Sequence, residues 1–335
     1  MAKRRFFLPS ALALLFAALL ISGCTSGPVL TSPRDPQLEL TLIGAPVPPT
    51  VLVTHMTNSP DLAAISERVI FERTDDINAL RQGIDAGRIH GGMASTTTLA
   101  VLRNEGAPVQ IVDVFGWELL YLLSGEKEID SWESLRGSKV AVAYRGSVTD
   151  VIFQYLAAQG GVSVGDDLVM RYAREPLEAA EVLAGKQVQA AVLGEPWTTV
   201  AIFDGEEADE PVHRAMNLQE EWGALLGTKP RIPQVAFFVT DSLAAEHPEM
   251  IAALHAALID AADWAAADPD AAAADVARLT RLSEAVSAES LAYSGLTVVP
   301  AAEARPELER MFQVLYDANP ELIGGKLPDD GFYGE

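Results

Sequence analysis

Cysteine is almost absent from this 335-residue sequence, which contains one, Cys24. A single cysteine excludes a disulfide framework within the chain. Hydrophobic residues make up 49% of the sequence, which is ample for a packed core. The folded state is therefore expected to be stabilised by hydrophobic burial.

Positive charge is also scarce, because 24 Lys and Arg stand against 47 Asp and Glu and the formal net charge is −23. Such acidity argues against nucleic-acid binding and against direct adhesion to anionic lipid. An anionic ligand is not excluded, since local amides and helix N-termini decide whether one binds.

The common catalytic and metal-binding motifs are missing as well. There is no GxSxG, Walker A or dinucleotide-type glycine pattern, so an ATPase would have to be a separate subunit and no cofactor is expected. The acidic pairs Asp75-Asp76 and Asp166-Asp167 are typical of helix starts or loops. The histidines show no metal-ligand spacing, so we expect no metal site; they are His55, His90, His213, His247 and His255.

The N-terminus predicts export. Lys3, Arg4 and Arg5 precede an apolar run that is too short for a comfortable membrane span and is typical of a signal peptide. The run ends in Leu20-Ile21-Ser22-Gly23-Cys24, which resembles the lipobox of bacterial lipoproteins. That resemblance implies a signal over residues 1–23 and acylation (palmitate or a similar chain) of Cys24, against the alternative of an ordinary secretory signal.

Residues 24–37 are rich in Ser, Thr, Gly and Pro, a composition that suits a flexible tether. Acyl chains anchor a protein without spanning the bilayer, so the globular part would lie in water at an extracytoplasmic membrane surface. About 300 residues remain, a length that suits two lobes.

Strands alternate with helices along most of the remaining chain, which predicts an α/β fold. The expected strands are 38–43, 69–71, 139–144, 168–172 and 234–240. A helix capped by Thr74 is expected to run to about Gly87, and another from Ser147 to Gly160. The region after Thr240 is expected to be helical, with helices over 251–267, 270–282 and 306–317.

Three segments resemble the nitrate/sulfonate/taurine group of ABC-importer binding proteins, which includes thiamine-pyrimidine binders. They are Leu135–Val142 followed by Tyr144–Ser147, Val182–Gly185 leading through Ala190–Val192 to Glu195-Pro196, and Gly92–Thr96 followed by Gly106–Val109. The resemblance extends from about Leu38 to the end of the chain.

This resemblance implies a type II periplasmic-binding fold, in which two α/β lobes close on a ligand about a hinge. The first lobe would comprise residues 38–124 with 235–335, and the second lobe residues 125–234. Ligands of such sheets bind beyond the carboxyl ends of the strands. That rule points to the turn over 44–50 and to three further turns.

Two of these turns offer hydroxyls and amides. Ser95, Thr96 and Thr97 follow an expected strand, and Gly146 and Ser147 follow another. Both groups are expected to contact ligand through side-chain hydroxyls or the free amides of a helix start. The alternative is simple helix capping.

The remaining turn holds Glu195 and Trp197, where a carboxylate beside an indole would suit an amine or a heterocycle N–H. Alternatively, Glu195 only favours its own helix N-terminus and Trp197 packs in the core. Trp117 and Tyr144 are candidates for the cleft wall. A hydrophobic hinge strand is the alternative for Trp117, and Tyr144 is similarly ambiguous.

The sequence therefore predicts a monomeric solute-binding lipoprotein that serves an ABC permease and its separate ATPase. The ligand would be a small organic molecule (a sulfonate, or a planar heterocycle such as a thiamine pyrimidine) or a nitrate-like anion, with the organic class favoured. Two alternatives are an enzyme on the same fold, of the pyrimidine- or menaquinone-synthesis type, and a ligand-sensing interaction module. An exported lipoprotein would lack the substrates of those cytoplasmic pathways, so no enzymatic activity is expected.

Overall fold

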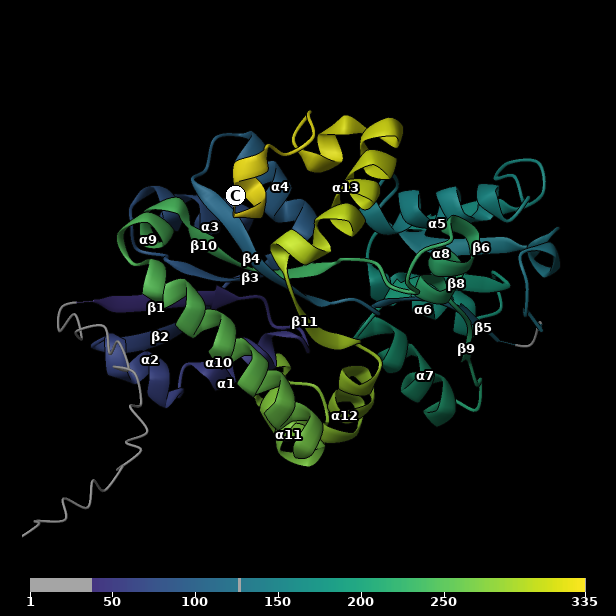
Figure 1. Ribbon diagram of the computed structural model, residues 1–335. Coiled ribbons are helices and arrows are strands. Elements are labelled where there is room, and N and C mark those ends of the chain that lie inside the picture. The colour runs from purple at the N-terminus through teal and green to yellow at the C-terminus, as the bar shows by residue number, and fades with distance from the viewer. Residues whose placement is uncertain (1–37, 126–127, 335) are drawn as a thin grey trace, which may run out of the picture. The chain divides into compact units, whose positions relative to one another are not determined.

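A computed structural model describes residues 38–125 and 128–334. The expected signal, the tether and Cys24 lie outside these residues. The described chain forms two β-sheets with helices on their faces (Figure 1). The expected two-lobed α/β fold is confirmed, and we call each sheet with its helices a lobe.

The first lobe contains a 6-stranded mixed sheet in which β1 pairs in parallel with β2 and β3. In sheet order its strands are β11 (Leu296–Pro300), β4 (Val109–Gly116), β10 (Val235–Thr240), β3 (Gly91–Ser95), β1 (Glu39–Gly44) and β2 (Arg68–Arg73). Strand β10 runs antiparallel to its neighbours β3 and β4, because it returns from the second lobe.

The second lobe contains a 5-stranded sheet of the same style, with β6 parallel to β7 and β8. In sheet order its strands are β7 (Val169–Ala173), β6 (Lys139–Ala143), β8 (Ala190–Gly194), β5 (Leu120–Ser124) and β9 (His213–Asn217). The expected boundary after Ser124 is too late. Leu120–Ser124 pairs with β8 and β9, so the chain has already entered the second sheet at Leu120.

The helices follow the same division. Those of the first lobe are α1 (Thr50–Met56), α2 (Pro60–Ile65), α3 (Ile77–Asp85), α4 (Thr96–Asn104), α9 (Asp241–Glu246), α10 (Pro248–Ala267), α11 (Pro269–Thr280), α12 (Glu284–Ala292) and α13 (Ala301–Ala318). Those of the second lobe are α5 (Val148–Gln159), α6 (Pro176–Ala184), α7 (Trp197–Glu207) and α8 (Leu218–Leu226). Short 3₁₀ turns cover Glu133–Leu135, Pro320–Ile323 and Asp330–Tyr333.

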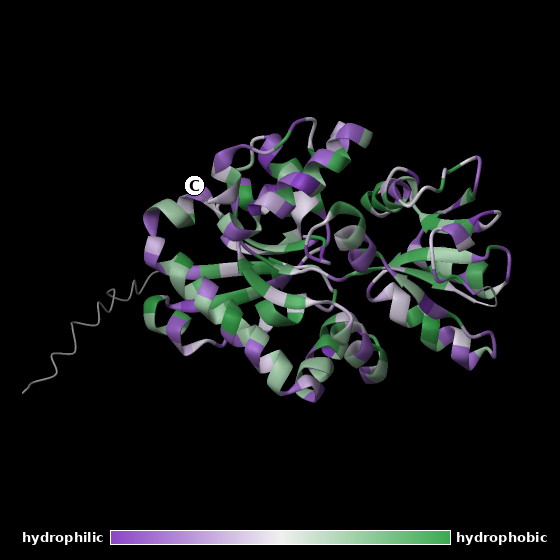
Figure 2. Cartoon of the chain, turned by 45° about the vertical axis from the view of Figure 1, so that its right-hand side comes forward, coloured by the Kyte–Doolittle hydropathy of each residue, from purple (hydrophilic) through white to green (hydrophobic). Residues whose placement is uncertain are grey.

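The hydrophobic core follows the strands, where apolar residues concentrate in both sheets (Figure 2). One cluster packs β1 and β10 against α1 and α10, and another packs β8 against α6. A third cluster runs without interruption through both lobes, from Ile111 and Phe312 to Leu122 and Phe153. Helix α10 is long and apolar enough to cross a membrane, but its buried residues join the first of these clusters.

The C-terminal region departs from the expected all-helical stretch. Leu296–Pro300 forms β11, an edge strand on β4, and α12 lies before it. Helix α13 begins at Ala301 and contains Pro306, which was expected to start it. Pro306 lies in the second turn, and α13 continues through it to Ala318.

Candidate functional site

A cavity of about 330 Å³ lies at the carboxyl ends of β1, β2 and β3. Leu119 and Gln234 line the cavity from the two segments that connect the lobes, and Glu195 lines it from the second lobe. The rest are Ile43, Ala45, Val47, Pro49, Thr74, Asp75, Asp76, Ile77, Leu80, Met93, Ala94, Ser95, Thr98 and Val235. Ligands of open α/β sheets bind at such an edge, so this cavity is the candidate site.

The turn after β1 forms one wall and is fixed by its own side chains. The Thr50 hydroxyl donates to the Ala45 carbonyl at 2.6 Å. A Cβ on Gly44 would lie 2.4 Å from the Thr50 methyl, so glycine is required for the turn to close this tightly. The hydrogen bond and the close approach therefore fix the shape of this wall.

Helix α3 begins beside this wall, and its cap differs from the expectation. Asp76, not Thr74, is the N-cap, and its Oδ1 accepts the amides of Asn78 at 2.7 Å and Ala79 at 3.2 Å. The Thr74 hydroxyl instead accepts the Asp76 amide at 3.3 Å. The α3 N-terminus therefore presents Asp75 and Asp76 at the cavity.

Of the three hydroxyl residues predicted after β3, Ser95 lines the cavity. Its Oγ accepts the Thr98 amide at 3.1 Å and donates to the Thr98 hydroxyl at 2.7 Å, which caps α4. Thr96 is buried and donates to the Pro233 carbonyl at 2.7 Å, and Thr97 is not among the lining residues. Thr98 was missed, although its position one helical turn after Ser95 could have indicated it.

Gly146 and Ser147 start α5 at the carboxyl end of β6. Gly146 has a φ of 75°, and its amide donates to Asp150 Oδ2 at 2.7 Å. Ser147 Oγ accepts the Asp150 amide at 3.3 Å and donates to the Ala143 carbonyl at 3.1 Å. Neither lines the cavity, and these bonds correspond to the capping alternative. Tyr144 precedes them and is 56% exposed.

Glu195 lines the cavity, but its carboxylate is already bound. Its side chain has no exposed area, Oε1 accepts Arg214 Nη2 at 2.7 Å, and Oε2 accepts the Thr199 amide at 3.2 Å and hydroxyl at 2.8 Å. Burial raises the pKa of the Glu195 carboxyl, and the Arg214 guanidinium opposes that rise. Trp197, the first residue of α7, is 39% exposed and lies outside the lining.

Arg214, which binds Glu195 behind the cavity wall, is another residue that sequence reasoning missed. From β9 it also donates from Nη1 to Glu289 of α12 at 2.7 Å, and its guanidinium lies 3.6 Å from the centre of the Tyr293 ring. The partners are 19 and 75 residues away, so no local pattern reveals them. This cluster joins the cavity wall of the second lobe to a helix of the first lobe.

Trp117 lies at the crossing between β4 and β5 and is 2% exposed. Its Nε1 donates to the Thr297 carbonyl at 2.7 Å, and Arg231 lies 4.0 Å above the ring. Arg231 comes from the second crossing segment and binds Glu307 of α13 with two hydrogen bonds. Trp117 therefore occupies a hinge position and is not among the cavity-lining residues.

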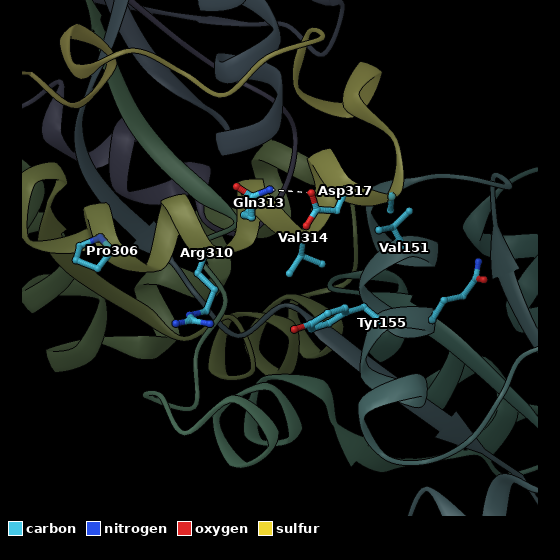
Figure 3. A pocket seen from close by; sticks show the side chains of 9 residues that line it. Val151, Tyr155, Pro306, Arg310, Gln313, Val314 and Asp317 are labelled. Atoms are coloured by element: carbon cyan, nitrogen blue, oxygen red, sulfur yellow. Dashed lines mark hydrogen bonds between the residues drawn. The ribbon is translucent and has the colours of Figure 1, made fainter.

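A larger depression of about 810 Å³ lies between α5 and α13 (Figure 3). Val151 and Tyr155 face it from α5, and Arg310 and Val314 from α13. No strand end contributes to its lining, so the rule that selects the first cavity does not select this one.

Within residues 38–125 and 128–334, no group of three His, Cys, Asp or Glu side chains could hold a metal ion.

Several solved structures share this architecture. An ABC transporter from Parabacteroides distasonis aligns with a TM-score of 0.73 at 18% identity, over 90% of this chain and 99% of that one. The periplasmic aliphatic sulphonate-binding protein SsuA of Escherichia coli gives 0.66 at 15% identity, over 88% and 91%. The periplasmic nitrate-binding protein NrtA of Synechocystis PCC 6803 gives 0.60 at 13% identity, over 86% and 84%. At these identities the likeness shows the fold.

Sequence comparison assigns the family. No curated protein matches the chain. The sequence profile of the NMT1-like family matches residues 74–281, which is more than half of the chain and includes the cavity-lining turns from Thr74 to Val235. With the sulphonate- and nitrate-binding neighbours, this match confirms the resemblance predicted from sequence: the chain belongs to the NMT1-like family and has the two-lobed fold of the periplasmic binding proteins.

Proposed function

We propose that this protein is an extracytoplasmic solute-binding lipoprotein of an ABC importer. It captures a small organic molecule between its lobes and delivers it to a permease that is driven by a separate ATPase subunit. Cys24 carries the lipid anchor, and the protein acts as a monomer without enzymatic activity.

The observation that carries this proposal is the position of the cavity. It lies at the carboxyl ends of three parallel strands of one lobe, and Glu195 of the other lobe completes it. The lobes are joined by short crossing segments around Trp117 and Gln234, which is the arrangement of hinged, ligand-closing proteins. SsuA and NrtA, which bind a sulphonate and nitrate, share this fold.

The size and lining of the cavity favour an organic solute over a small inorganic anion. A volume of about 330 Å³ is within the usual range of small-molecule sites. Apolar side chains such as Ile43, Met93 and Leu119 make up most of the wall. Burial of an apolar ligand body against them would contribute to binding in proportion to the area removed from water.

The test is a thermal-shift panel of organic amines, alkyl sulfonates, nitrate and heterocycles with the full chain in non-ionic detergent. A ligand at a hundred times its Kd should stabilise the fold by about 2.7 kcal/mol. The substitution Ala45→Trp, which fills the cavity wall, should abolish the response. The control Ala63→Trp, on the exposed side of α2, should retain it. Absence of any response, with no small molecule released on denaturation, would contradict the proposal.

The anchor has its own test. Cells producing the protein should incorporate labelled palmitate into it, and the label should stay with the membrane fraction. Replacement Cys24→Ala should remove both the label and the membrane association, because one acyl-bearing residue supplies the anchor. Label retained after the replacement would place the anchor elsewhere.

A further inference from the structure

The cavity has polar side chains in its lining, but no basic one. Its polar lining residues carry hydroxyl, carboxylate or amide groups; they are Thr74, Asp75, Asp76, Ser95, Thr98, Glu195 and Gln234. Among the three acids, the Glu195 carboxylate is buried and bound by Arg214 and Thr199, so Asp75 and Asp76 are the ones that can face a ligand. None of the described residues that line it is Lys, Arg or His. A desolvated anion needs a positive partner or several directed donors, and this wall offers hydroxyls and one amide but no positive side chain.

Two of the carboxylates are not neutralised. Asp75 and Asp76 are both exposed at the rim, and neither has an ion-pair partner within the described residues. Asp76 Oδ1 is occupied by two backbone amides, which leave its charge in place. Asp75 makes no such cap. The first-lobe side of the cavity therefore carries two exposed carboxylates and no basic lining residue.

The cations nearest the cavity lie outside its lining. Arg214 lies between two carboxylates, Glu195 and Glu289, so this group of three carries a net negative charge. Arg73 donates to the Leu279 carbonyl at 3.1 Å. Together with Arg281 and Asp75 it lines a neighbouring depression, and neither arginine lines the cavity.

On the second lobe, two further arginines are engaged by neighbours on their own side. Arg145 stacks at 4.8 Å on the Tyr172 ring, and Arg174 forms an ion pair with Glu178 at 3.0 Å. Neither lines the cavity, so they do not offset its negative charge at close range.

Two acids near the hinge have raised pKa values. The pKa of Glu118, beside Leu119 of the cavity wall, is raised first by burial and then by repulsion from Glu220. The pKa of the Tyr121 hydroxyl is likewise raised by burial and by Glu195 and Glu118. Burial is the larger cause of both shifts, and neither residue lines the cavity.

On the basis of the solute-binding function above, we propose that the cavity selects an organic cation: a protonated amine on an apolar body. The apolar part packs against residues such as Ile43 and Met93, and the ammonium group donates to the Asp75 and Asp76 rim. An oxyanion of the same size would be placed beside these carboxylates without a compensating cation, which is a repulsive element of specificity.

The experiment compares three probes with one carbon skeleton, namely hexylammonium, 1-hexanol and hexanesulfonate. Their binding to the full chain in non-ionic detergent is measured by isothermal titration calorimetry at low salt. Hexylammonium should bind most tightly, 1-hexanol less tightly, and hexanesulfonate least. Raising the salt concentration should narrow this difference, because the rim charges are exposed and screened.

Asp75→Asn keeps the shape of the side chain and removes its charge. It should weaken hexylammonium binding by roughly fivefold, as expected for one partly exposed ion pair, and leave 1-hexanol unchanged. The matched control is Asp61→Asn, an exposed aspartate in the first turn of α2 that does not line the cavity, which should bind all three probes as the natural chain does.

The outcomes separate this inference from the proposed function. Hexanesulfonate binding as tightly as hexylammonium would overturn the cation selectivity while supporting solute binding. An equal effect of Asp75→Asn on all three probes would also overturn it. Binding of none of the three, with no amine released from the denatured protein, would count against both.

Discussion

Glu195 is the residue where the sequence suggested a ligand contact and the structure places a buried ion pair. Its side chain is fully buried, while that of Arg214 is 12% exposed. Both carboxylate oxygens are satisfied, by Arg214 on one side and Thr199 on the other. The carboxylate therefore helps to fix the position of the cavity wall and has no oxygen left without a partner.

Loss of Arg214 would leave this carboxylate buried without its cation. We expect Arg214→Met to lower the free energy of unfolding by about 3–5 kcal/mol, the usual cost of breaking a buried pair from one side. Urea unfolding of the full chain measures it. The comparison Arg231→Met removes an arginine from the more accessible pair with Glu307, where the side chains are 15% and 16% exposed, and should cost less. A larger loss for Arg231→Met would contradict this ranking.

Asp113 supplies a prediction on pH. Burial raises the pKa of its carboxyl, and His255, whose Nδ1 lies 2.7 Å from Oδ1, opposes the rise; Oδ2 is buried without a partner. The folded state therefore binds the proton more tightly than the unfolded state, where the pKa of an aspartate is about 3.9. Stability contributed by this group is present at low pH and is lost as pH rises from there through the folded pKa.

Asp113→Asn removes this titration. The variant should show a shallower fall of Tm with rising pH in the range just above pH ~4 than the natural chain does. Asp270→Asn, at an exposed position in the first turn of α11, is the control and should leave the slope unchanged. Parallel Tm profiles for Asp113→Asn and the natural chain would show that Asp113 titrates alike in both states.

The residues that sequence reasoning found are those whose role is local. Ser95 and Ser147 both cap helices, and a serine before an apolar helical pattern shows that role within four residues. Arg214 could not be found, because its partners come from other elements and are brought to it by the fold. Trp117 was named from the sequence, but its hydrogen-bond acceptor, 180 residues away, could not be.

At the scale of elements, the central strands β6 and β10 were predicted, as were the edge strands β2 and β7, whereas the edge strand β11 and helix α12 were not. The strands β6 and β10 have continuous apolar runs, since helices cover both of their faces. Strand β11 pairs on one side only and ends at Pro300, so its short pattern resembles a loop. Helix α12 has weak amphipathicity for its length and was missed for that reason.

The pairing of β1 with β3 depends on a glycine. Gly92 has a φ of 140°, and a Cβ there would lie 2.2 Å from the Ile43 carbonyl oxygen. Gly92→Ala should therefore destabilise the fold by at least about 3 kcal/mol, because backbone of the neighbouring strand must move. Gly87→Ala is the control: Gly87 also has a positive φ, of 64°, but open space around it, and should cost about 1–2 kcal/mol. Chemical denaturation measures both, and equal losses would show that close approach is not what requires Gly92.

At the scale of the molecule, the two lobes are joined by more than the crossing segments. An apolar cluster continues from one sheet to the other, and α12 of the first lobe packs against α7 of the second. The Arg214–Glu289 ion pair also links the two lobes, because it joins β9 to α12 at 2.7 Å. Since Arg214 also holds Glu195 at the cavity, the same guanidinium contacts the ligand wall and the lobe interface.

This arrangement predicts that Glu289 biases the lobes toward the conformation described. Glu289 is 33% exposed, so its ion pair with Arg214 is worth about 1 kcal/mol, which corresponds to roughly a fivefold shift between two lobe arrangements. Glu289→Gln should let the ligand-free protein sample wider separations, seen as a larger radius of gyration in small-angle X-ray scattering. Arg214 keeps its bond to Glu195 in this variant, so the cavity wall should stay intact.

Glu284→Gln is the matched control, because it makes the same change of charge in the exposed first turn of the same helix. It should leave the radius of gyration unchanged, and both variants should unfold at nearly the natural denaturant midpoint. If the two variants scatter alike, the ion pair does not hold the lobes, and the α7–α12 packing with the shared apolar cluster must set their separation. The other outcome is that only Glu289→Gln expands and that a bound solute restores the natural radius of gyration. Lobe position and cavity occupancy are then coupled through Arg214, because a ligand that binds one lobe arrangement better shifts the population toward it.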